Sequence, residues 1–306
     1  MKYEVRHEAF HDAVPREASL LPIATGFTFT EGPIWDGSSL FFSDIAESKQ
    51  WVWREGEGAR VARAPSGQAN GNCLDTDGRI VSCEHATSTV TRHEHGGKVV
   101  RAIATRYEGR RLNSPNDIVC DARGRLYFTD PTYGRTREDL GILREPELDH
   151  RGLYRLDPPE ENEGEGSLTL LADDFDQPNG LCFDVTGTKL LVNDSPRFHI
   201  RIFDFDDGRV SGGDVWADVT GDGSEVPGSA KWVPDGMKTD TEGRIWVNGP
   251  GGVHVFDAEA RDLGVILMPE KSTNFCFGGA EMSDLFITAS TSVYRLRTLA
   301  TGVSLP

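Results

Sequence analysis

The chain has 306 residues, of which 37% are hydrophobic and 26% charged, and its formal net charge is −17 at pH 7. That charge repels the phosphates of nucleic acids, so we expect no nucleic-acid partner. The N-terminal residues carry charges where a signal peptide needs an apolar core, and no run approaches the roughly 18 apolar residues of a membrane-spanning helix, so we expect a cytoplasmic protein with no membrane partner.

One short block of sequence recurs six times along the chain. Each copy has a leading polar residue, an apolar run, a turn residue five positions after the leading residue, and a second apolar run. Two apolar runs joined by a tight Asp or Gly turn are typical of a β-hairpin. In chain order, the leading and turn residues are Glu31 and Asp36, Asn70 and Asp75, Asn116 and Asp121, Asn179 and Asp184, Asp235 and Asp240, and Asn274 and Gly279.

The stretches between the hairpins predict the rest of the fold. They contain further short apolar runs, such as residues 51–54 and 200–204, which bring each repeat to four strands. We therefore predict an all-β protein, a six-bladed β-propeller with four-stranded antiparallel blades around a central channel. No linker divides the sequence, so we expect one domain over residues 1–306, in which residues 1–20 form an extension that is partly mobile or closes the last blade.

The six leading residues indicate a binding site. The innermost strand of every propeller blade lines the channel, so equivalent residues of the six blades meet at one mouth. Asn and Asp are poor strand residues, which argues that their oxygens are used. Six converging oxygens, with the carboxylates of Glu31 and Asp235 among them, suit one hard divalent cation, Ca²⁺ before others, although Mn²⁺, Mg²⁺, Zn²⁺ and Fe²⁺ also bind carboxylate-rich sites. The alternative is that these residues only form turns.

Several motifs around the leading residues resemble the SMP-30/gluconolactonase family over almost the whole chain. They are EGPIW at Glu31, RLNSPND at Asn116, QPNG at Asn179, VPDGMKTDTEGRIWV at Asp235 and CFGG after Asn274. The resemblance implies a six-bladed propeller that holds a divalent metal ion in its channel and hydrolyses sugar lactones. It implies that Glu31, Asn179 and Asp235 are metal ligands and that Asp235 is the candidate general base. Asn116 would complete the ligand set or contact the substrate.

The expected function is therefore metal-dependent hydrolysis of gluconolactone or a related aldonolactone to the aldonic acid, with the metal polarising the carbonyl and activating water. The only partner that we expect is this small-molecule lactone. Since a metal-bound carboxylate is a weaker base, a free carboxylate competes with Asp235 for the role of base. Two other functions stay open. One is hydrolysis of phosphotriesters or organophosphate fluorides on the same metal, as in the related diisopropyl fluorophosphatase, and the other is a non-catalytic Ca²⁺-binding propeller.

Other residues could support the site or bind the substrate. The second strand of each hairpin returns to the same mouth 13 to 15 residues after the leading residue. His85 returns there and is a candidate substrate contact, and Arg111 and Asn113 lie just before the third block, where they could hydrogen-bond to sugar hydroxyls. Residues that could orient the ligands from behind, or hold a water, are Asn70, Asn274, Asp44, Glu84, Asp130 and Asp194. For the three aspartates, capping of loops is the open alternative.

Overall fold

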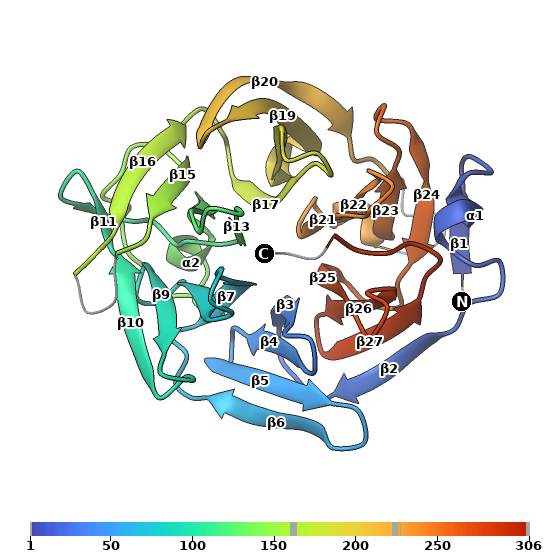
Figure 1. Ribbon diagram of the computed structural model, residues 1–306, viewed down its shortest axis with the longest axis horizontal. Helices are drawn as coiled ribbons and strands as arrows, with labels where there is room; N and C mark the ends of the chain where they lie inside the picture. Colours follow the sequence, from blue (N-terminus) through green and yellow to red (C-terminus); the bar gives the residue numbers. More distant parts are fainter. Residues whose placement is uncertain (1, 160–163, 222–225, 227, 304–306) are drawn as a thin grey trace.

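Six antiparallel sheets stand as blades around a central channel in the computed structural model, which describes residues 2–159, 164–221, 226 and 228–303 (Figure 1). The prediction of an all-β, six-bladed propeller is confirmed. From the channel outward, blades 1 to 3 consist of β3 (Thr30–Trp35), β4 (Leu40–Asp44), β5 (Lys49–Arg54) and β6 (Gly58–Arg63); β7 (Ala69–Leu74), β8 (Ile80–Glu84), β9 (Thr89–Glu94) and β10 (Val99–Ala104); and β13 (Ile118–Cys120), β14 (Leu126–Asp130), β15 (Gly152–Asp157) and β16 (Ser167–Ala172).

The second half of the chain forms the other three blades. From the channel outward they consist of β17 (Pro178–Phe183), β18 (Lys189–Asp194), β19 (His199–Asp206) and β20 (Arg209–Asp218); β21 (Met237–Thr239), β22 (Ile245–Gly249), β23 (Gly252–Phe256) and β24 (Asp262–Leu267); and β25 (Ser272–Gly278), β26 (Asp284–Ala289), β27 (Ser292–Arg297) and β2 (Leu20–Thr25).

A few short elements are additional to the four strands of each blade. They are the strand β1 (Lys2–Val5), the hairpin of β11 (Arg106–Tyr107) and β12 (Arg110–Arg111), the helices α1 (Phe10–Ala13) and α2 (Tyr133–Thr136), and the 3₁₀ turns η1 (Ser195–Arg197) and η2 (Ser229–Lys231). None of the helices within the described ranges has the length and apolar character needed to cross a bilayer.

Strands from both ends of the chain close the ring of blades. β2 pairs with β27, so the sixth blade combines an N-terminal strand with three C-terminal ones. β1 pairs with β24 and adds a fifth strand to blade 5. Between these strands, α1 buries Phe10 completely against Trp246 of blade 5 and Phe275 of blade 6. Residues 2–13 therefore pack on the outer side of blades 5 and 6.

The turn chemistry explains why the hairpins form where the sequence predicts them. Asp75 accepts hydrogen bonds from the N–H groups of Asp77 and Arg79, at 3.0 and 2.9 Å, and its second oxygen pairs with the Arg79 side chain at 2.7 Å. Gly78 supplies a φ of +73° within the same turn, a conformation that favours glycine. The turns from Asp121 and Asp240 repeat the pattern.

The apolar core is divided among the interfaces between blades. One cluster, for example, joins Val81 and Val90 of blade 2 to Leu126 and Phe128 of blade 3, and none of these four side chains is exposed. The same cluster includes Cys73 of β7 and Ile118 of β13, so close packing between blades also holds these innermost strands in place around the channel.

The strand ladder is interrupted at the leading residues. In blades 1, 2, 4 and 6 the pairing of the innermost strand shifts register there, and in blades 3 and 5 the strand begins two residues after Asn116 and Asp235. Bulges and strand ends re-aim side chains and release them from the pleat of a regular strand. Asn, Asp and Glu are therefore accommodated at these positions without the usual cost of a poor strand residue.

Candidate functional site

The six leading residues lie at the same end of the channel, because each one stands at the start of an innermost strand and these strands are neighbours around the ring. All six are buried, and the most exposed of them, Asp235, is only 8% exposed. We call them the ring. Its members are Glu31, Asn70, Asn116, Asn179, Asp235 and Asn274.

The ring carboxylates lie within each other's electrostatic field. Burial raises the pKa of Glu31 well above its usual value, and the charges of Asp235 and Asp117 raise it further. Burial likewise raises the pKa of Asp235 to about 7, against the opposing effect of the nearby Lys271 ammonium. Carboxylates from blades 1 and 5 are therefore brought together in a buried space where two negative charges are costly.

Hydrogen bonds orient two of the ring amides. The Asn179 Nδ2 group donates to Ser195 Oγ at 3.1 Å and also hydrogen-bonds to Asp235, which leaves the amide oxygen available for a ligand. Asn274 is turned the other way, because its Oδ1 accepts from Lys238 Nζ at 3.2 Å while its amide hydrogen-bonds to Glu31. Asn179 is thus arranged to offer an oxygen to the channel, and Asn274 to hold Glu31 in place.

The His85 side chain is engaged within the protein. Its side chain is fully buried, and both ring nitrogens are used within the protein. Because the Leu140 carbonyl can only accept, Nδ1 carries the proton and donates to it at 2.9 Å, so Nε2 accepts from Asn70 Nδ2 at 3.1 Å. Burial lowers the pKa of His85 to about 4, so the imidazole is uncharged at pH 7. His85 therefore orients the Asn70 amide, with its oxygen left for the channel.

Replacing His85 by Phe is expected to lower the free energy of unfolding at pH 7 by about 1 to 3 kcal/mol, because the Asn70 amide and the Leu140 carbonyl lose their buried partner. Urea unfolding measures the change. His85→Gln can still donate and accept, so it should recover part of the loss. A Phe variant as stable as the parent protein would show that the hydrogen bonds of His85 carry no stability.

The carboxylates expected behind the ring cap loops instead. Asp44 accepts hydrogen bonds from the N–H groups of residues 28 and 29, at 3.1 and 2.9 Å. Asp194 accepts from those of residues 176 and 177, at 2.8 and 2.9 Å. Asp130 accepts one such bond at 2.8 Å in blade 3. Each carboxylate holds the loop that enters its own blade, which is the alternative left open by the sequence.

The residue before each of these aspartates faces the ring, since side chains alternate along a strand. Ser43, Thr129 and Asn193 each donate to the backbone carbonyl of the leading residue in the next blade, at 2.8, 2.8 and 2.5 Å. These bonds fix the ring backbone from one blade to the next. The side chains that hold the ring backbone thus lie one residue before the aspartates that the sequence predicted.

The other predicted contacts also lie away from the ring. Glu84 pairs with Arg63 at 2.8 Å and accepts from two threonine hydroxyls. Asn113 is fully buried and donates through Nδ2 to the carbonyls of Asp130 and His150, at 3.1 and 2.9 Å, so it anchors loops. Arg111 donates to the Thr87 carbonyl at 2.8 Å. Of the four predicted substrate contacts, the structure brings only Asn116 to the ring.

Two polar residues near the ring were not predicted. Asp117 follows Asn116 at a position where blades 1, 2, 4 and 5 have glycine, and its buried Oδ2 has no hydrogen-bond partner among the described residues. The ammonium of Lys238 lies close enough to lower the pKa of Asp117, although burial has the larger, opposite effect. Lys238 stands where the other blades have apolar residues or cysteine. Both departures from the repeat are visible in the sequence and could have been noticed.

Tyr133 was also missed, and it begins α2, in the long segment between β14 and β15. It hydrogen-bonds to Ser195. Burial raises the pKa of its phenol, and the negative charge of Asp235 raises it further. The side chain is half-buried. Tyr133 therefore places a hydroxyl beside the ring, at the side that Asn179 and Asp235 form.

The ring fits a divalent cation by the chemistry of its donors. Two buried carboxylates with raised pKa values meet amide oxygens, and buried charges of this kind are normally paired or bound to a metal. Among the described residues, no three His, Cys, Asp or Glu side chains cluster as metal ligands. The predicted set of Glu31, Asn116, Asn179 and Asp235 does not require such a cluster, because two of its four members are asparagines.

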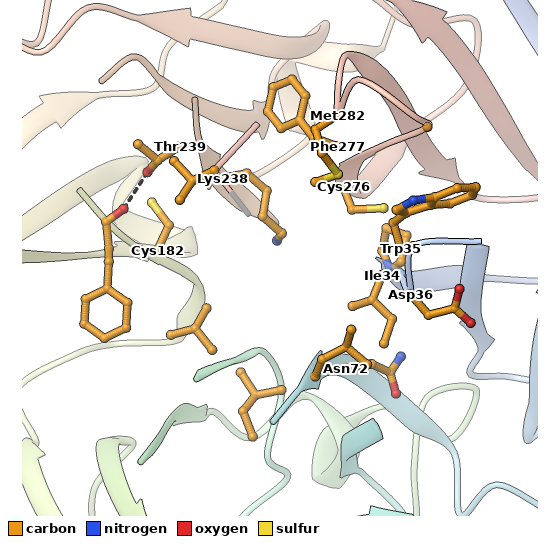
Figure 2. A pocket seen from close by; sticks show the side chains of 18 of the residues that line it. Ile34, Trp35, Asp36, Asn72, Cys182, Lys238, Thr239, Cys276, Phe277 and Met282 are labelled. Carbon is orange, nitrogen blue, oxygen red and sulfur yellow. Dashed lines mark hydrogen bonds between the residues drawn. The ribbon is translucent and has the colours of Figure 1, made fainter. Parts of the chain in front are cut away.

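The opposite end of the channel has a different character. A cavity of about 450 Å³ opens there, bordered by the hairpin turns at Asp36 and Gly279 and by apolar side chains such as Trp35 and Met282. Figure 2 shows Lys238 reaching from one side into the middle of this space. The polar ring and the apolar cavity thus occupy the two ends of one channel, and polar chemistry belongs to the ring end.

Comparisons with known proteins agree with this architecture. Residues 29–291 match a family model described as SMP-30/Gluconolactonase/LRE-like region. The chain is 30% identical over 299 residues to the gluconolactonase of Zymomonas mobilis, covering 92% of this chain and 81% of that protein. It superposes on XC5397, a gluconolactonase from Xanthomonas campestris, with a TM-score of 0.86 and 32% identity, over 97% of this chain and 95% of the other. Regucalcin from Agrobacterium tumefaciens, a calcium-binding protein, shares the fold with a TM-score of 0.75 and 19% identity, over 94% and 97% of the two chains.

Proposed function

Because the chain belongs to the SMP-30/gluconolactonase/LRE-like family, we propose that it hydrolyses a sugar lactone, gluconolactone or a related aldonolactone, with one divalent cation held by Glu31, Asn116, Asn179 and Asp235. The observation that carries the proposal is the meeting of two buried carboxylates with raised pKa values at a polar channel mouth. Ca²⁺ is the ion that we favour, since its oxygen-rich ligand preference suits the donors and the structurally similar regucalcin is a calcium-binding protein.

When bound, the cation supplies a Lewis acid that polarises the lactone carbonyl and stabilises the oxyanion. We assign Asp235 the role of base. It takes a proton from the attacking water and passes it to the leaving oxygen of the lactone as the C–O bond breaks. Burial favours its protonated form, while Lys271 and Asn179 favour its ionised form, so these neighbours tune its basicity. Tyr133 and Asn70 offer a hydroxyl and an amide oxygen to the hydroxyl groups of the sugar.

A pH-stat assay tests the proposal. The purified protein is offered a panel of aldonolactones and one organophosphate fluoride, with Ca²⁺, Mn²⁺, Mg²⁺ or Zn²⁺ added after chelation. We expect lactone hydrolysis that chelation removes and that added metal restores. Turnover of the organophosphate alone would favour the phosphotriesterase function, and full lactonase activity in the metal-free protein would overturn the metal-dependent mechanism.

The affinity for Ca²⁺ is expected to rise at least about tenfold per pH unit between pH 5 and 7, because burial raises the pKa values of both Asp235 and Glu31 and the ion must displace their protons. In the metal-free folded protein Asp235 keeps its proton up to a pKa of about 7, whereas in the unfolded chain the proton leaves near pH 4. The stability that this proton confers is therefore present below about pH 4 and is lost as pH rises through 7. Calcium must displace the proton, so binding weakens as pH falls.

Isothermal titration with Ca²⁺ at pH 5, 6 and 7 measures this dependence. Buried His85 and His93, whose pKa values burial lowers to about 4, stay mostly neutral between pH 5 and 7 and therefore add little to this dependence. Asp235→Asn should make the pH profile less steep, because Glu31 is then the one ring carboxylate left to release a proton. An unchanged dissociation constant between pH 5 and 7 in the parent protein would contradict the assignment of Asp235 as a ligand.

A further inference from the structure

Three arginine side chains from other parts of the chain contact the turn between β8 and β9, beside the ring. Arg135 of α2 and Arg144 of the following loop both donate through Nη2 to the hydroxyl of Ser88. Arg111, at the end of β12, donates to the carbonyl of the neighbouring Thr87 at 2.8 Å. Three cationic groups from two separate segments thus converge on two consecutive residues. We call them the arginine cluster.

The cluster lacks the anions that buried guanidinium groups normally have. Arg135 is only 3% exposed, yet its Nε and Nη1 have no hydrogen-bond partner within the described ranges, and the same holds for Nε of Arg144. Among the residues that the structure describes, no carboxylate forms an ion pair with Arg135 or Arg144. By contrast, Arg92 is 2% exposed and pairs with Glu94 at 2.7 Å. An unpaired buried cation is costly, and one hydroxyl and a backbone carbonyl do not replace a carboxylate.

The charges of the cluster also act on one another. Burial lowers the pKa of Arg144 to about 10, and the neighbouring Arg111 charge lowers it further, while Glu147 opposes them. An arginine beside a bound anion would shift the other way. In a chain with a net charge of −17, this is a local excess of positive charge, with three arginines beside the one carboxylate of Glu147, which accepts from the Arg111 backbone N–H at 2.7 Å.

The cluster adjoins the ring. Gly134, next to Arg135, packs so closely that a Cβ there would lie 2.7 Å from the Cβ of His85 and 2.9 Å from that of Ser114. His85 in turn holds the ring residue Asn70. Arg111 and Arg144 are half-buried, so these two members of the cluster are in reach of solvent.

We propose that Arg111, Arg135 and Arg144 form an oxyanion site that binds a phosphate group. Arginine forks match the geometry of phosphate oxygens, and the orphaned N–H groups of Arg135 and Arg144 are the donors that the anion would satisfy. The phosphate is either a free ion or a substituent of a sugar substrate at the neighbouring mouth. The second source alone rests on the proposed lactonase function.

Isothermal titration of the metal-free protein with inorganic phosphate tests the site, after the chelator has been removed by dialysis so that neither it nor a metal competes. We expect binding of one phosphate per chain, and an affinity at least tenfold lower in Arg144→Gln and in Arg135→Gln. Arg144→Gln is the safer variant, because that side chain is only half-buried. Arg106→Gln is the matched control and should bind as the parent protein does, because Arg106 is exposed on β11, the strand that pairs with β12, and forms an ion pair with Glu147 at 3.6 Å.

Two results would overturn the proposal: no phosphate binding by the parent protein, or equal binding by Arg144→Gln and Arg106→Gln. A kinetic comparison then separates the sources. If the phosphate belongs to the substrate, Arg144→Gln lowers kcat/KM at least tenfold for an aldonolactone with a phosphate ester and leaves the unphosphorylated lactone unaffected. If the anion is free, both lactones respond alike and added phosphate changes both rates. Because the titration needs no turnover, failure of the lactonase proposal would leave its result interpretable.

Discussion

Asp235→Asn and Glu31→Gln are each expected to lower kcat/KM for the lactone at least about a thousandfold, which corresponds to about 4 kcal/mol of transition-state stabilisation. Each substitution keeps the size of the side chain and removes one of the two carboxylates that would balance the charge of the cation. Asp235→Asn also removes the proposed base. Steady-state kinetics at saturating Ca²⁺, together with Ca²⁺ titration, separate a loss of metal from a loss of proton transfer.

The fold should survive both substitutions. The two carboxyl groups have raised pKa values because their charges are costly where they lie, so a neutral amide should leave the metal-free protein at least as stable at pH 8. Asp204→Asn is the matched control, since Asp204 pairs with Lys189 on the exposed outer part of blade 4. Activity within tenfold of the parent protein in Asp235→Asn would exclude Asp235 as ligand and base.

Gly180→Ala is expected to lower the free energy of unfolding by about 3 kcal/mol or more. A Cβ on Gly180 would lie 2.0 Å from the backbone oxygen of Asp235 and 3.0 Å from Asn193 Nδ2, the group that donates to that same oxygen. Backbone atoms held between two blades cannot move aside cheaply. The variant should therefore lose stability and, because the ring backbone shifts, calcium affinity as well.

Urea unfolding and calcium titration measure these two losses. Gly164→Ala is the matched control, because a Cβ at Gly164 meets nothing within 4 Å and the residue has no left-handed backbone that glycine alone prefers. If Gly180→Ala unfolded at the same urea concentration as Gly164→Ala, the close packing between the inner strands of blades 4 and 5 would not require a glycine at position 180.

Much of the architecture was predictable because its causes are local. Alternating apolar runs and Asp–Gly turns depend on residues within a few positions, and the carboxylate of Asp75, Asp121 or Asp240 caps its own hairpin. The ring was predictable for a related reason. A repeat that places equivalent residues at one mouth needs only the spacing of the blocks, and the structure brings the six leading residues to that mouth.

The residues behind the ring were harder to predict. Whether Asp44 or Ser43 faces the channel depends on how many residues the bulge at Glu31 inserts into the ladder. That number depends on how the two strands pair, which the pattern of apolar residues does not show. The role of His85 likewise depends on the Leu140 carbonyl, 55 residues away in the chain.

The sequence by itself determined the six blades, the register of the leading residues and the family resemblance, since these follow from short-range periodicity and turn chemistry. Only the tertiary structure decided which ring oxygens are left for a ligand, why Gly180 must lack a side chain, and that Arg135 is buried without an anion. The physical reason is that hydrogen-bond partners, close approach and burial of charge are relations between segments, and a linear pattern records each segment separately.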